Sequence, residues 1–117
     1  MKPVTETSFD ENWNKVEALL MARFGKLPDL EGILYLIGIN ELGRVPEEAF
    51  SKEQKQDLMH IATCALLAQS GYYVYAGHDE DGWPHYTLVE APQALTMAEQ
   101  EQLLKQHIIT YFEAEAS

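Results

Sequence analysis

A single hairpin pattern constrains this fold more than any other feature of the sequence. Between Tyr72 and Val89, two aromatic and β-branched runs flank an Asp-Glu-Asp-Gly turn, which predicts an antiparallel β-hairpin. A lone hairpin is marginally stable and has two open edges, so it must pack on other elements. The rest of the chain has helical periodicity. We therefore predict an α+β fold with four main helices packed with one antiparallel β-hairpin inserted between the third and fourth helices.

Three of the four predicted helix starts share one signature, a hydroxyl residue followed three positions later by Glu or Gln. Such a capping box satisfies backbone N–H groups that a helix start leaves unbonded. The pairs are Ser8 with Glu11, Ser51 with Gln54, and Thr96 with Glu99. Together with the apolar periodicity, they predict helices at about Phe9 to Phe24, Leu30 to Leu42, Lys52 to Ser70 and Met97 to Glu113.

The segment from Leu30 to Leu42 is apolar on nearly every side, which is typical of an element with several buried faces. Its β-branched residues also fit a strand. The long apolar span, the acidic residues in the first turn and Gly43 after the end favour a helix. After it, we expect a connection from Arg44 to Pro46 and a short turn from Glu47 to Phe50.

Length and charge bound the class of protein. With 117 residues the chain is about one domain long, so we expect a single domain over residues 1–117. Its formal net charge is −11 and its eight Lys and Arg residues do not cluster, so we expect no nucleic-acid and no membrane partner. Cys64 is the only cysteine, and the first residues lack the apolar run of a secretory signal. These features predict a reduced, cytoplasmic, soluble protein.

The register of the hairpin decides which side chains share a face. A two-residue turn places His78 opposite His85, and a four-residue loop places it opposite Trp83; both put the two histidines on one face, whereas a three-residue loop separates them. In the first two registers, one face carries Tyr72, Val74, Ala76, His78, Trp83, His85, Thr87 and Val89, and the other carries Tyr73, Tyr75, Gly77, Pro84, Tyr86 and Leu88. Neither face is polar.

A hairpin that is apolar on both faces needs cover on both. One face can lie on the helices, and a second copy of the chain can cover the other face or pair along the free edge. The alternative is that helices of the same chain cover both faces. We hypothesise a small soluble interaction or accessory protein without catalytic chemistry. We expect it to form a homodimer through its aromatic hairpin, or to bind an unidentified protein partner there.

The second hypothesis is a small enzyme or ligand-binding protein with a pocket between the hairpin and the helices. The candidate ligand or partner surface comprises Tyr73, Tyr75, His78, Trp83, His85 and Tyr86. The sequence has no Walker-type loop and no Gly-x-Gly-x-x-Gly, Gly-x-Ser-x-Gly or Cys-x-x-Cys motif. We therefore assign no catalytic residue and no cofactor.

Two sequence clusters contain metal-ligating residue types. The first is His78, Asp79, Glu80, Asp81 and His85, although Asp is also what a tight turn requires. The second is a stripe on the third helix, formed by Glu53, Asp57, His60 and Cys64. This stripe has two functional interpretations. The Cys–His pair binds a metal ion, or the imidazole lowers the pKa of the thiol. The simpler interpretation of the stripe is a second buried face of a central helix, and we predict no metal site.

Overall fold

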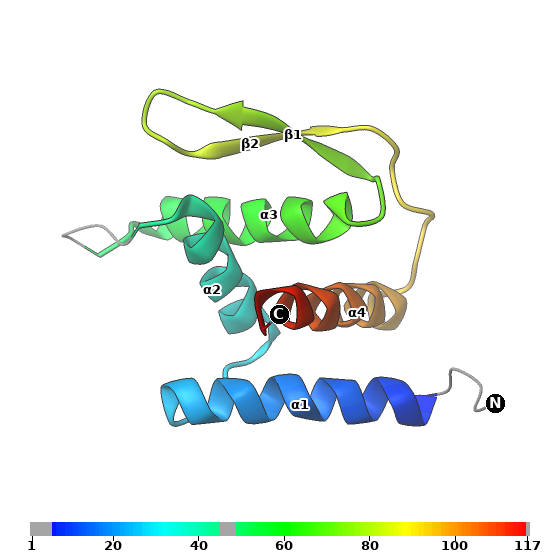
Figure 1. The fold of residues 1–117 in the computed structure, drawn as a ribbon. Coiled ribbons are helices and arrows are strands. Elements are labelled where there is room, and N and C mark those ends of the chain that lie inside the picture. Colours follow the sequence, from blue (N-terminus) through cyan, green and yellow to red (C-terminus); the bar gives the residue numbers. More distant parts are fainter. Residues whose placement is uncertain (1–5, 45–48, 117) are drawn as a thin grey trace. The chain divides into compact units, whose positions relative to one another are not determined.

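The computed structural model describes residues 6–44 and 49–116 (Figure 1). Within these residues it has four helices and one two-stranded antiparallel sheet between the third and fourth helices, which confirms the predicted α+β layout. The elements are α1 (Glu6–Phe24), α2 (Leu30–Leu42), α3 (Lys52–Ala68), β1 (Tyr73–His78), β2 (Pro84–Leu88) and α4 (Met97–Ala116). The turn predicted from Glu47 to Phe50 falls largely outside the described residues.

The backbone contacts divide the chain into two compact units. One consists of Met1–Pro28 with Leu95–Ser117, and the other of Asp29–Ala94. In the first unit, α1 packs on α4, and the ammonium group of Lys105 lies 5.2 Å from the ring centre of Trp13. The prediction of one domain over residues 1–117 stays a prediction.

Two of the three predicted capping boxes form. The hydroxyl of Ser51 accepts a hydrogen bond from the Gln54 N–H, and the Gln54 side chain accepts one from the Ser51 N–H. Thr96 and Glu99 make the same reciprocal pair, at 3.1 and 2.9 Å. The prediction at Ser8 is wrong, because α1 begins two residues before it and Ser8 therefore lies inside the helix.

The segment from Leu30 to Leu42, whose sequence fits either a helix or a strand, is a helix with the predicted bounds. The side chain of Asp29 caps its start by accepting a hydrogen bond from the Gly32 N–H at 2.8 Å. Gly43 ends it with a left-handed φ of 82°, a conformation that glycine adopts without a steric penalty. Local capping signals therefore outweigh the β-branched content of this segment.

Helix α3 is the centre of the unit formed by residues 29–94. The hairpin lies along it and α2 crosses it (Figure 1). Gly38 of α2 approaches Leu58 of α3 so closely that a Cβ at Gly38 would lie 2.2 Å from the Leu58 carbonyl oxygen. Leu42, Phe50 and Leu58 form a buried cluster, and the ring of Trp83 packs edge-on against Phe50. The hairpin is thereby attached to the core.

The first half of the hairpin has the register of the predicted four-residue loop. The opposite pairs are Tyr73 with Leu88, Val74 with Thr87, and Tyr75 with Tyr86. The face that carries Tyr73 and Tyr86 is partly buried on α3. On the opposite face, Val74 is exposed, so helices of this unit cover one face of the hairpin and not both.

The second half of the hairpin contains a β-bulge. Tyr75 lies opposite Tyr86, but His78 lies opposite Pro84. Two residues of β1, Ala76 and Gly77, therefore stand opposite the single residue His85 of β2. Gly77 has a φ of 99°, which favours glycine at this position. Near the turn the pairing is therefore that of a three-residue loop, the alternative that separates His78 from His85. The shift brings His78 to Tyr75 instead, and the two side chains hydrogen-bond.

Candidate functional site

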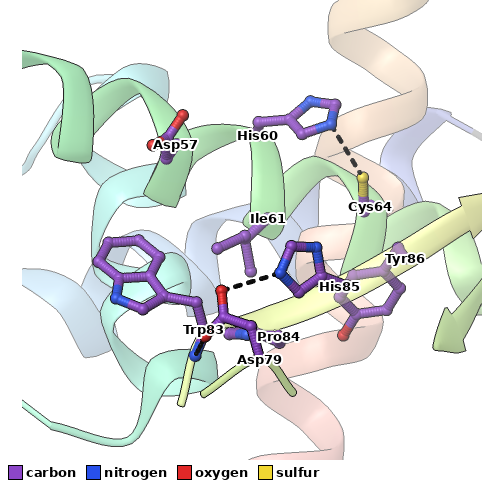
Figure 2. A pocket seen from close by; sticks show the side chains of 9 residues that line it. All are labelled: Asp57, His60, Ile61, Cys64, Asp79, Trp83, Pro84, His85 and Tyr86. Carbon is purple, nitrogen blue, oxygen red and sulfur yellow. Dashed lines mark hydrogen bonds and ion pairs between the residues drawn. The ribbon is translucent and has the colours of Figure 1, made fainter. Parts of the chain in front are cut away.

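A pocket of about 310 Å³ lies between α3 and the hairpin, inside the unit of residues 29–94 (Figure 2). It is lined by Asp57, His60, Ile61 and Cys64 of α3, and by Asp79, Trp83, Pro84, His85 and Tyr86 of the hairpin. Three of these residues, Ile61, Cys64 and Pro84, are buried, and the carboxylates and imidazoles are more exposed. An apolar base with a few polar groups and a volume of this size is typical of a small-molecule site.

The helix side of the pocket holds a buried thiol. Cys64 Sγ lies 3.5 Å from His60 Nε2, one helical turn away. Burial raises the pKa of the Cys64 thiol, and a hydrogen bond with Tyr73 partly offsets this effect. The net direction is upward, which is opposite to the change in thiol pKa that activation by His60 would produce. A protonated thiol is a poor nucleophile, so burial disfavours the reactive thiolate form of Cys64.

The hairpin side of the pocket is organised by the carboxylate of Asp79. Its Oδ1 accepts hydrogen bonds from the N–H groups of Asp81 and Trp83, both at 2.9 Å, and its Oδ2 lies 3.0 Å from His85 Nε2. The Gly82 N–H donates to the Asp79 carbonyl oxygen and closes the turn. The interaction with His85, followed by the backbone bonds, lowers the pKa of Asp79. Asp79 is therefore ionised at neutral pH.

Tyr86 connects the pocket wall to α2. Its hydroxyl donates to Glu41 at 3.3 Å. Burial, together with the charge of Glu41, raises the pKa of Tyr86 to about 12. The phenol therefore remains a neutral hydrogen-bond donor at physiological pH and is not a general base.

Half of the predicted surface residues line this pocket, namely Trp83, His85 and Tyr86. The others, Tyr73, Tyr75 and His78, are not part of its lining. Tyr73 hydrogen-bonds to the thiol of Cys64. The Tyr75 ring packs against His78, with ring centres 5.3 Å apart, and against the pocket residue Tyr86, with ring centres 5.8 Å apart. Three of the four helical lining residues, Asp57, His60 and Cys64, belong to the stripe that the sequence analysis identified on α3, whereas Ile61 does not. Only tertiary packing places them against the hairpin.

The pocket groups do not form a metal centre. Across residues 6–44 and 49–116, no three His, Cys, Asp or Glu side chains converge in a way that would hold a metal ion. The two carboxylates that line the pocket, Asp57 and Asp79, come from different elements, as Figure 2 shows. Among the described residues of the lining there is no lysine and no arginine.

Comparisons with protein-family models, with curated proteins and with solved structures found no match to this chain. In the part of the chain that the structure describes, every helix is too short or too polar to cross a membrane. The fold and the site thus define a small α+β protein with a surface hairpin and a pocket beneath it.

Proposed function

We propose that this protein is a small interaction protein, without catalytic chemistry of its own, that forms a homodimer through its hairpin. The observation that carries the proposal is the exposure of large apolar side chains on the ribbon. On the face opposite to α3, Val74 is 53% exposed and Val89 63%. On the face that packs on α3, Tyr75 and Leu88 are still 49% and 52% exposed. Fully burying an exposed side chain of this kind stabilises an assembly by about 1.5–3 kcal/mol before the costs of association, and covering one that is already half buried contributes about half as much.

The absence of charge on the strands supports the same proposal. The chain has eight basic and nineteen acidic residues, but β1 and β2 contain none of them. Monomeric proteins usually protect exposed strand edges with charged side chains or proline. Here only Pro84, at the first position of β2, has that effect, so the edges remain able to pair.

A second copy of the chain is the occupant that we favour for this surface. Two chains with a net charge of −11 repel each other, and the strands are a place where they can meet without opposing like charges. A two-fold axis would bury the same patch on both copies. Because strands of six and five residues give a small interface, we expect a dissociation constant on the order of ten micromolar.

Sedimentation velocity over a range of concentrations tests the dimer. The wild-type protein should move from one chain mass toward two as concentration rises. Val74→Lys places a charge in the exposed face and should remain monomeric at concentrations where the wild type is dimeric. Ala114→Lys adds the same charge at an exposed position of α4 and is the matched control. Equal association of both variants would contradict a hairpin interface.

We also propose a cytoplasmic location and no nucleic-acid partner. Cys64 is a buried free thiol, and it is the only cysteine, which suits a reducing compartment. The strong negative charge disfavours contact with phosphate backbones. An unrelated protein that docks on the same ribbon is the competing proposal, and a free chain that stays monomeric at every concentration contradicts the homodimer.

Binding of a small ligand is a second candidate function, which the pocket between α3 and β2 favours. Its buried base and polar rim are what ligand sites share, and its thiol is not activated, so we propose binding rather than catalysis. Thermal unfolding with metabolite mixtures tests it. A ligand at a hundred times its dissociation constant stabilises a protein by about 2.7 kcal/mol.

A further inference from the structure

We propose that the pocket between α3 and the hairpin binds a small organic cation, such as a primary amine. This inference rests on the second candidate function, that the pocket is a ligand site, and adds the chemical class of the ligand. It depends on the carboxylates of the lining, on its aromatic rings, and on the fact that no lysine or arginine is among the described lining residues.

The lining supplies negative charge from two elements. Asp79 is ionised and fixed by the turn, with one oxygen on two backbone N–H groups and the other on His85. Asp57 comes from α3 and has no hydrogen-bond or ion-pair partner among the described residues. An ammonium group in the pocket would give Asp57 a partner and form a charge-assisted hydrogen bond.

Aromatic rings form the other part of the pocket wall. Trp83 and Tyr86 are both partly buried, and their positions are fixed by Phe50 and by Glu41, respectively. The negative face of an aromatic ring attracts a cation, and indole does so best. Carboxylate and aromatic groups on the walls of one pocket are the combination that recognises organic ammonium ions.

The alternative of an anionic ligand has little support from the lining. Arg44 is the described basic side chain that contacts the turn, but it donates to the Asp81 carbonyl oxygen and does not line the pocket. The two imidazoles are the remaining candidates for an anion. One of them, His85, is already bound to Asp79. A cation therefore fits the charges better than an anion does.

Three probes of nearly equal shape separate these classes: benzylamine, benzyl alcohol and benzoate. The reporter is the indole N–H resonance of Trp83, which Trp13→Phe distinguishes from the signal of the other tryptophan. We expect benzylamine to shift this resonance until the site is saturated. Its dissociation constant should be at least about tenfold below that of benzyl alcohol, and benzoate should bind most weakly of the three. If the alcohol or benzoate binds equally well, the pocket stands and the cation class is overturned. If no probe shifts the resonance, both the pocket function and the cation class are overturned.

A pair of charge variants locates the site. Asp57→Asn should weaken benzylamine binding about tenfold and leave benzyl alcohol nearly unchanged, because only the charged contact is lost. Glu53→Gln removes the same charge from an exposed position of α3 outside the pocket. It should change the benzylamine affinity by less than about twofold. Equal weakening by both variants would mean that the general acidity of the chain attracts the probe, and this would overturn the site.

Discussion

At the scale of single residues, Gly38 sets how closely α2 and α3 approach. A Cβ at this position would lie 2.2 Å from the carbonyl oxygen and 2.9 Å from the Cβ of Leu58. We expect Gly38→Ala to lower the free energy of unfolding by about 3 kcal/mol, because the helices must separate. Gly25→Ala is the control, because a Cβ at Gly25 would meet no neighbouring atom. The only cost there is the left-handed backbone conformation, with a φ of 73°. It should cost about 1 kcal/mol. Urea denaturation measures both, and equal losses would contradict a close approach of the helices.

Cys64 provides a second test at this scale. Because burial raises the pKa of its thiol, alkylation by iodoacetamide should be slow at neutral pH and should accelerate only above the ordinary titration range of a thiol. Tyr73→Phe removes the hydrogen bond that lowers this pKa, so it should slow the reaction further. Protein unfolded in urea gives the reference rate. Rapid modification of the folded protein near pH 7 would indicate that His60 activates the thiol, contrary to our interpretation.

At the scale of elements, helices were easier to predict than the details of the hairpin. Ser51, Thr96 and Gly43 act within one helical turn, so the sequence alone reveals them. Ser8 shows the limit of this reasoning, because the same hydroxyl signature also occurs inside a helix. The bulge at Gly77 was missed because a glycine in a strand does not by itself specify which register the two strands adopt.

The candidate site shows the same limit between elements. The stripe on α3 and the turn histidines were each recognisable as clusters, but their meeting depends on how the hairpin packs on α3. The ring of Trp83 against Phe50 and the bond from Tyr86 to Glu41 fix that packing. Both are contacts between residues distant in sequence, for which periodicity and capping give no signal.

The bond between Tyr86 and Glu41 gives a prediction about pH. The phenol has a pKa of about 12 in the folded protein and about 10.0 as the reference, so the unfolded state loses its proton first. The stability that Tyr86 contributes is complete below pH 10 and is lost as the pH rises toward 12. At pH 8, the free energy of unfolding of Tyr86→Phe should be about 1 kcal/mol lower than that of the wild type. Between pH 10 and 12, the variant should lose less stability than the wild type does. Urea denaturation across this range measures it, and parallel curves for both proteins would contradict the account.

At the scale of the whole molecule, the acidity of the chain opposes the proposed assembly. Two copies with a net charge of −11 repel each other over a distance that salt shortens, from about 30 Å at 0.01 M to about 3 Å at 1 M. Since the proposed interface is free of charged residues, salt should screen the repulsion without breaking any ion pair. We expect dimerisation to strengthen several-fold between low and high NaCl, as measured by sedimentation. Weaker association in high salt would mean that charged contacts outside the strands hold the copies together.

The proposed homodimer through the exposed ribbon is best tested by an isotope-filtered NOE experiment on a mixture of labelled and unlabelled chains. A homodimer through the hairpin predicts cross-peaks between copies that involve the methyl groups of Val74 and Val89, at concentrations where the sedimenting mass is that of two chains. Cross-peaks confined to other residues, or a sample that stays at the mass of one chain, would contradict it.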